Sequence, residues 1–484
     1  HPTPLDQRGT MERMLESFDR RRDLRRHRTA LADSGIAGTE IHYPFFWPTA
    51  RWLASRWGDQ LEIDWPAYDD HERLQGRLHL LVPYSETPGL DENDFPLPGW
   101  LDRMKGPAET DAAYLVRRME ALRMSEVTRE TFYQELGVPM RLKPGAGTPT
   151  RTRARYDPSP VAYRETPPTR RRPILPAEIN QPPLSVTDLP PREGRKIVDL
   201  AREAMVTRAR DLDVFAYGDP TDVRLVDCGD GLQFAIFSAI PERRLLLEAV
   251  YGFLTLKNGV PIGYVLISAL YGSSEIAFNV FETYRGTEAA HIYGRVLATV
   301  RHLFNIDAFT IYPYQLGHGN EEGLRSGAWW FYQKLGFRPR DPEVVRLMGQ
   351  ELAALRLDPS HRSSLATLRK LSAENVYLYM GNPRDDIIGV VPFGNIGLHV
   401  TRHLAAHGGS DREGAVRTCS REAMNLLGVR TRSGFSAGEK LAWERWSPLV
   451  SVLPGLRRWS PADKAALVRV IRAKGGPRES EFVL

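Results

Sequence analysis

The chain of 484 residues has few features that would mark an extracellular or membrane protein. It contains only two cysteines, Cys228 and Cys419, which excludes a disulfide framework or a cysteine-rich zinc module and fits a reducing compartment. No run of about 18 apolar residues exists to span a membrane. The N-terminal segment HPTPLDQRGTMERML lacks the apolar stretch of a secretory signal. We therefore expect a cytoplasmic protein without a membrane association.

Several common catalytic and binding motifs are also missing. Lys143 begins the segment KPGAGT, which resembles a phosphate loop but lacks its Gly-Lys-Ser/Thr ending. No G-x-S-x-G turn is present. His399, His403 and His407 share one helical face at a spacing that could bring two imidazoles to a metal, but no glutamate lies between them as in H-E-x-x-H. A polar or partly buried helix face is the favoured interpretation, and we expect no metal.

The composition is that of a globular protein with a sizeable core. Hydrophobic residues make up 42% and charged residues 26% of the chain. Its length predicts two or three domains. The net charge of +5 permits an anionic ligand without requiring nucleic acid.

Changes in composition divide the chain into four segments. Residues 1–142 form a mixed, mainly helical region, and residues 346–484 show mostly helical spacing of apolar residues. Between them lie a Pro/Arg-rich segment at 143–183 and a domain at 184–345. Prolines in the Pro/Arg-rich segment remove backbone donors, which predicts a linker or a wrapped extended arm. Its arginines could contact nucleic acid, although a solvated linker is favoured: Arg151, Arg153, Arg155, Arg170, Arg171 and Arg172.

Local patterns predict further elements. Residues 82–107, rich in proline, glycine and acids, are expected to be irregular. Strands are expected at Asp213–Tyr217, Arg224–Asp227 and Leu232–Phe237. Ser460 followed by proline is a strong signal for the start of a helix.

The stretch from Tyr251 to Pro339 carries the clearest pattern. Two apolar runs flank Asn258-Gly259, the dipeptide best suited to a type I′ hairpin turn. A third strand ends at Val280-Phe281, and an amphipathic helix is expected from Gly286 to Phe304, followed by another strand and an aromatic-rich helix. A strand that opens onto a helix N-terminus can bind an anion, because unpaired N–H groups and the helix dipole face the ligand.

The segments FNVFETYRGTEAAHIYGRVL and AWWFYQKLGF resemble the GNAT acyltransferase superfamily. The resemblance implies an α+β fold for 184–345, with a mixed, mostly antiparallel sheet flanked by helices. The strand ending at Val280 and Phe281 would splay from its neighbour and admit the pantetheine arm of acetyl-CoA or another acyl-CoA. The turn that follows would wrap the diphosphate; its residues are Arg285, Gly286, Thr287, Glu288, Ala289 and Ala290.

The same resemblance assigns two catalytic residues. Tyr332 matches the family tyrosine that protonates the departing thiolate. Glu275 is placed like the carboxylate base of one branch of the family, and strand alternation puts it on one face with Ala277 and Asn279. Glu248 and Glu282 are competing bases.

Two positions depart from the family pattern. Glu288 replaces the usual middle glycine of the turn, and Arg325 stands where the family often has asparagine.

These features predict an acyl-CoA-dependent N-acyltransferase, in which a small-molecule or peptide amine attacks the thioester directly. One alternative keeps the fold with an acyl-carrier or aminoacyl-tRNA donor, or with another reaction of an acyl-CoA. The other is a non-catalytic scaffold for ligand binding or interaction.

Overall fold

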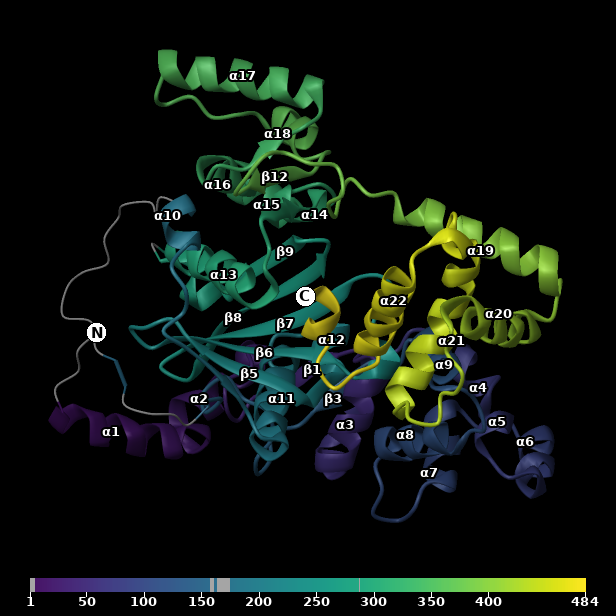
Figure 1. The fold of residues 1–484 in the computed structure, drawn as a ribbon. Coiled ribbons are helices and arrows are strands. Elements are labelled where there is room, and N and C mark those ends of the chain that lie inside the picture. Colours follow the sequence, from purple (N-terminus) through teal and green to yellow (C-terminus); the bar gives the residue numbers. More distant parts are fainter. Residues whose placement is uncertain (1–4, 157–160, 163–174, 287) are drawn as a thin grey trace. The chain divides into compact units, whose positions relative to one another are not determined.

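The structure, a computed structural model, describes residues 5–156, 161–162, 175–286 and 288–484 (Figure 1). The chain divides into two compact units. The first comprises residues 1–157 and 198–217, and the second residues 158–197 and 218–484, so helix α11 (Pro191–Val206) contributes to both. Thr287 and the arginines Arg170, Arg171 and Arg172 lie outside the described residues.

The first unit is mainly helical, with a small antiparallel sheet in the order β1-β3-β2. Its aromatic residues form a core, in which the rings of Trp47 and Tyr133 lie 5.3 Å apart. The partly buried carboxylate of Asp211 accepts hydrogen bonds from the backbone N–H of Phe46 and the hydroxyl of Thr49. The elements are α1 Leu5–Glu16, α2 Arg22–Arg26, α3 Trp47–Trp57, α4 His71–Gln75, α5 Leu78–Leu81, α6 Thr87–Glu92, α7 Leu97–Met104, α8 Asp111–Ala121, α9 Glu126–Leu136, α12 Asp213–Ala216, β1 Ile41–Tyr43, β2 Leu61–Ile63 and β3 Met140–Leu142.

Two of the local predictions for this unit are wrong. Residues 82–107 contain helices α6 and α7, because Pro88 and Pro98 each occupy the first turn, where a helix needs no N–H donor. The expected strand at Asp213–Tyr217 is the short helix α12. A short apolar run does not distinguish strand from helix by its periodicity.

The second unit is built on a sheet that, within the described residues, has nine strands in the order β11-β12-β10-β9-β8-β7-β6-β5-β4. Every neighbouring pair is antiparallel except β9 and β10, which run parallel. The predicted α+β class is confirmed. The strands are β4 Ser185–Asp188, β5 Gly218–Asp227, β6 Leu232–Ala239, β7 Ala249–Lys257, β8 Val260–Leu270, β9 Ser273–Val280, β10 Ala308–Ile311, β11 Arg338–Pro339 and β12 Val376–Tyr379.

The β7–β8 hairpin has the predicted turn. Asn258 and Gly259 both adopt positive φ, at 50° and 78°, as a type I′ turn requires. The strands at Arg224–Asp227 and Leu232–Phe237 are confirmed as parts of β5 and β6.

Helix α13 (Ala289–Phe304) packs its apolar stripe on the sheet (Figure 1). It begins at Ala289 rather than at Gly286. Leu175 and Ile179 of α10 (Leu175–Ile179), at the end of the Pro/Arg-rich segment, are buried in the same core.

Residues after 345 are mostly helical, as expected, but strand β12 lies among them and takes its place between β10 and β11 in the sheet. The remaining helices of this unit include α22, which begins with the predicted Ser460 cap. None of the helices in the described ranges is long and apolar enough to cross a membrane. The helices of the second unit that follow α13 are α14 Pro313–Leu316, α15 Glu321–Ser326, α16 Ala328–Lys334, α17 Pro342–Leu357, α18 Leu365–Leu371, α19 Phe393–Gly408, α20 Arg412–Leu427, α21 Ala437–Val452, α22 Pro461–Lys474 and α23 Ser480–Val483.

Candidate functional site

Strands β9 and β10 part from each other within the sheet. They pair only from Ser273 to Glu275 on β9, opposite 308–310 on β10. On its other side, β9 remains paired with β8 as far as Val280. Among the described strands, none pairs with the edge of β9 from Ile276 to Val280 that faces β10. Within the described residues, this edge of β9 is therefore unpaired.

Backbone groups point into this opening. The N–H of Phe281 donates to the carbonyl of Ile262 on the β8 side. Because antiparallel pairs alternate between bonded and non-bonded, the backbone groups of Ile276 and Phe278 are directed away from β8. Ile276 is fully buried, whereas Phe278 is partly exposed, so its N–H and C=O are the groups that an extended ligand could pair with, as an added strand would.

A glycine on β8 allows the paired edge of β9 to approach that strand closely. Gly263 lies opposite Val280, and a Cβ at this position would come within 2.4 Å of the carbonyl oxygen of Asn279. Such a contact cannot be accommodated without moving the backbone. Gly263 thus fixes the position of the end of β9.

The turn after β9 joins the opening to the N-terminus of α13. Arg285 donates from Nε to the carbonyl of Val280 at 3.1 Å and pairs with the exposed carboxylate of Glu322 at 2.5 Å. The side chain of Arg285 is itself 44% exposed. Apart from its two neighbours in the chain, no described residue has an atom within 4 Å of the position that a Cβ of Gly286 would take. Glu288 is partly buried at the N-cap of α13 and makes no side-chain capping bond there.

A chain of aromatic rings connects β9 to Tyr332. The ring of Tyr293 on α13 lies 5.2 Å from that of Phe278 and 5.6 Å from that of Tyr332 on α16. Tyr332 is 4% exposed, and its burial raises the pKa of its hydroxyl well above the usual value. The Tyr293 hydroxyl and Asn279 Oδ1 are buried and have no hydrogen-bond partner within the described residues. A bound ligand could satisfy such orphaned polar atoms.

Glu275 lies where the pairing of β9 with β10 ends. It is opposite Ser268 on β8 and Thr310 on β10. Burial, and then the nearby charge of Glu248, raise its pKa to about 7. No partner for its carboxylate is found in the described part of the chain. A carboxyl group with this pKa can accept a proton near neutral pH.

The structure places the predicted catalytic residues on the two sides of the open edge. Phe278 faces α13, so by alternation Glu275 faces away from that helix, while Tyr332 lies on the α13 side. The two residues do not bond to each other. Of the competing carboxylates, Glu282 is exposed beyond the end of β9. Glu248 immediately precedes β7, where burial raises its pKa.

A group of buried charged side chains next to Glu248 was not predicted from the sequence. Lys474 donates to the carbonyl of Glu248 at 2.7 Å and pairs with Glu479 at 2.5 Å. Both side chains are almost fully buried. Arg244 lies 3.8 Å from Glu479 and donates to the carbonyls of Lys474 and Gly476. Lysine and glutamate five residues apart are common on surfaces, so the spacing alone carries no signal.

Comparison with known proteins identifies no relative. No family model, curated protein or solved structure matches the chain. The chemistry of the chain must therefore be inferred from the site itself.

The three histidines lie on α19, as predicted. The rings of His403 and His407 are 4.2 Å apart, and His403 Nε2 lies 3.6 Å from the Sγ of Cys419. Burial lowers the pKa of His403, and the neighbouring His407 lowers it further. The described residues contain no group of three or more His, Cys, Asp or Glu side chains that could hold a metal ion.

Proposed function

We propose that the second unit is a GNAT-like acyltransferase that transfers an acyl group from acyl-CoA to an amine. The observation that carries this proposal is the parting of β9 from β10 beyond Glu275. It leaves a strand edge free for an extended thioester between a tyrosine and a carboxyl group.

The residues at the opening fit an acyl-CoA, which would be a substrate rather than a resident cofactor. Amide groups of a pantetheine arm would pair with the backbone of the partly exposed Phe278. The diphosphate would meet the first turn of α13 and Arg285, which can exchange its exposed partner Glu322 for a phosphate. Open space at Gly286 allows a close approach. Glu288 is unfavourable, because its charge has the same sign as the diphosphate.

The reaction needs two proton transfers. The amine nitrogen attacks the thioester carbonyl and loses a proton to Glu275. The tetrahedral intermediate then expels the thiolate, and the Tyr332 hydroxyl protonates its sulfur. The products are an amide and a free thiol. The resulting tyrosinate regains a proton from solvent or, through solvent, from the protonated Glu275.

Substituting Gly286 tests the binding of the donor. We expect Gly286→Asp to weaken CoA and acetyl-CoA binding by about tenfold or more, because it adds a negative charge beside the diphosphate. Since no described residue beyond its chain neighbours lies within 4 Å of the Cβ position, the substitution should not disturb the fold. Calorimetric titration of both variants with CoA, acetyl-CoA and longer acyl-CoAs measures the effect.

Gly286→Ala is the matched control, because it fills the same space without charge and should bind like the unmodified protein. If no CoA species binds the unmodified protein, the proposal fails. The function would then lie with an acyl-carrier or aminoacyl-tRNA donor, or with a scaffold without catalysis.

Replacing Tyr332 tests the general acid. Tyr332→Phe keeps the packing against Tyr293 and Phe337 and removes only the hydroxyl. We expect kcat to fall by about 10²-fold, with the Kd for acyl-CoA unchanged. Release of free thiol from acyl-CoA with a panel of amines gives kcat, and calorimetry gives Kd. Unchanged turnover would remove Tyr332 from the mechanism.

A further inference from the structure

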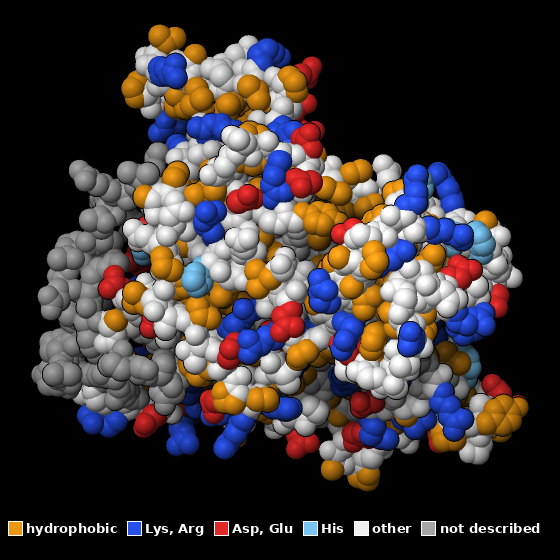
Figure 2. Space-filling view, viewed as in Figure 1, with side chains coloured by type: hydrophobic (Ala, Val, Ile, Leu, Met, Phe, Trp, Pro, Cys, Tyr) orange, Lys and Arg blue, Asp and Glu red, His pale blue; other side chains and the backbone are white. Residues whose placement is uncertain are grey.

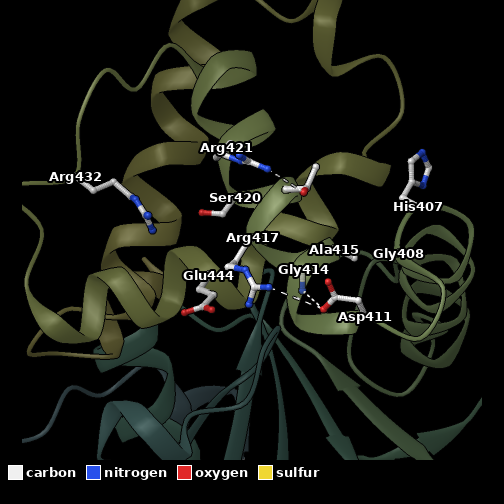
Figure 3. A pocket seen from close by; sticks show the side chains of 11 residues that line it. His407, Gly408, Asp411, Gly414, Ala415, Arg417, Ser420, Arg421, Arg432 and Glu444 are labelled. Atoms are coloured by element: carbon white, nitrogen blue, oxygen red, sulfur yellow. Dashed lines mark hydrogen bonds and ion pairs between the residues drawn. The ribbon is translucent and has the colours of Figure 1, made fainter.

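A second cavity lies among the C-terminal helices, on elements that the proposed acyltransferase site does not use. It has a volume of about 680 Å³ and is bordered by the end of α19, by α20 and by α21 (Figure 3). This volume is within the range of small-molecule sites. On the face shown in Figure 2, lysine and arginine side chains gather over these helices.

Three arginines line the cavity and have weak partners or none. Arg417 and Arg421 are four residues apart on α20, and Arg432 comes from the loop before α21 (Figure 3). Arg417 lies 3.9 Å from the exposed Asp411, and Arg421 donates only to the Thr418 hydroxyl at 3.2 Å. The guanidinium of Arg432 makes no ion pair or hydrogen bond with any residue that the structure describes. Their donors are thus available to a ligand.

A buried hydroxyl points into the same cavity. Ser420 is 6% exposed, and its Oγ has no partner within the described ranges. Figure 3 shows this oxygen directed toward the side on which Arg432 lies. Ser447, on α21, shows the usual arrangement of a serine inside a helix. Its hydroxyl donates to the backbone carbonyl of Trp443, four residues earlier. The unsatisfied Ser420 hydroxyl is the second, independent sign of a ligand.

We propose that this cavity binds the phosphate group of a small molecule. A phosphate carries close to two negative charges and several acceptor oxygens, which matches three guanidinium groups and one hydroxyl donor. Glu444 also lines the cavity and lies beside Arg417 in Figure 3, where its carboxylate can accept a hydrogen bond from a hydroxyl or amine of the same ligand. The ligand class is therefore a phosphomonoester or diphosphate that also carries a hydroxyl or amine donor.

Calorimetric titration of the full chain with inorganic phosphate, pyrophosphate and glucose 6-phosphate tests this site. We expect saturable binding of at least one of them. Arg421→Gln and Arg432→Gln should each weaken it by about tenfold or more, because each removes a charge-assisted bond. Ser420→Ala should weaken it about threefold to tenfold. Thermal unfolding checks that each variant is folded.

Two control variants show whether binding depends on this cavity. Arg469→Gln removes the same charge from an exposed position on α22 and should bind normally. Gly286→Asp should also bind normally, because it affects only the turn before α13. Three results would overturn the proposal. Arg469→Gln could lose as much affinity as the cavity variants, Gly286→Asp could be the only variant to lose affinity, or no saturable binding could be observed. Malonate binding as tightly as the phosphates would overturn the assignment of phosphate.

Discussion

Glu275→Gln is expected to make the protein more stable in alkaline solution. Burial and the charge of Glu248 raise the pKa of Glu275 to about 7, above the value of about 4.3 in an unfolded chain. The protonated form therefore favours folding. This contribution is complete below about pH 4.3 and is lost as the pH rises through 7. Glutamine stays neutral and avoids the loss.

The size of this effect follows from the shift in pKa. A difference of this extent corresponds to about 2–3 kcal/mol in the free energy of unfolding, after allowance for partial exposure. We expect the free energy of unfolding of Glu275→Gln to exceed that of the unmodified protein by this amount at about pH 9. At about pH 4 the two values should be equal. Urea unfolding at both pH values measures the difference.

The same substitution should remove the general base. We expect kcat/KM for acyl transfer to fall by about 10²–10³-fold. The unmodified protein should lose activity as the pH falls below about 7, because the base then becomes protonated. Glu282→Gln, at an exposed position just beyond β9, is the control and should change neither stability nor rate. An active Glu275→Gln, or one that gains no stability in alkali, contradicts this assignment.

Lys474→Met is expected to destabilise the second unit strongly. The substitution preserves most of the volume of the side chain but removes the partner of Glu479, which is 1% exposed. Arg244 remains at 3.8 Å, too far for a hydrogen bond to compensate. A charge left buried without its partner costs about 3–5 kcal/mol. Denaturant unfolding followed by tryptophan fluorescence should show a lower midpoint.

The neighbouring pair supplies the control. Arg478 and Asp188 form an ion pair at 2.9 Å in which both side chains are about half exposed. Arg478→Met should therefore cost less than about 1 kcal/mol. Replacing Glu479 by glutamine in the Lys474→Met protein should recover part of the loss, since it removes the unpaired charge. Equal costs for Lys474→Met and Arg478→Met would show that burial does not strengthen the first pair.

Local signals in the sequence predicted those parts of the fold that depend on neighbouring residues. The Asn258-Gly259 turn and the helix start at Ser460 are set by backbone preferences within a few residues. Strand β12 was missed, although three of its four residues (VYLY) are β-branched or aromatic. Its place between β10 and β11 depends on pairing with residues far away in the chain.

The candidate sites were predictable to different degrees. A family-like pattern pointed to Glu275, Tyr332 and the turn at Arg285, and the structure adds the open edge and the raised pKa of Glu275. Arg421 and Arg432 lie on a helix and a loop that look like ordinary charged surface in the sequence. Only packing shows that they share a cavity with the buried hydroxyl of Ser420, so no local pattern could have revealed it.

The contacts of Lys474 and Glu479 also bear on how the protein folds during synthesis. The backbone N–H of Glu479 bonds to Asp222, 257 residues earlier, and Lys474 bonds to Glu248, 226 residues earlier. Ribosomes add about 5–20 residues per second. The residues of β5 and β7 are therefore synthesised on the order of 10–50 s before these partners. During that interval Asp222 lacks one of its native partners, and the half-built sheet is open to chaperones and proteases.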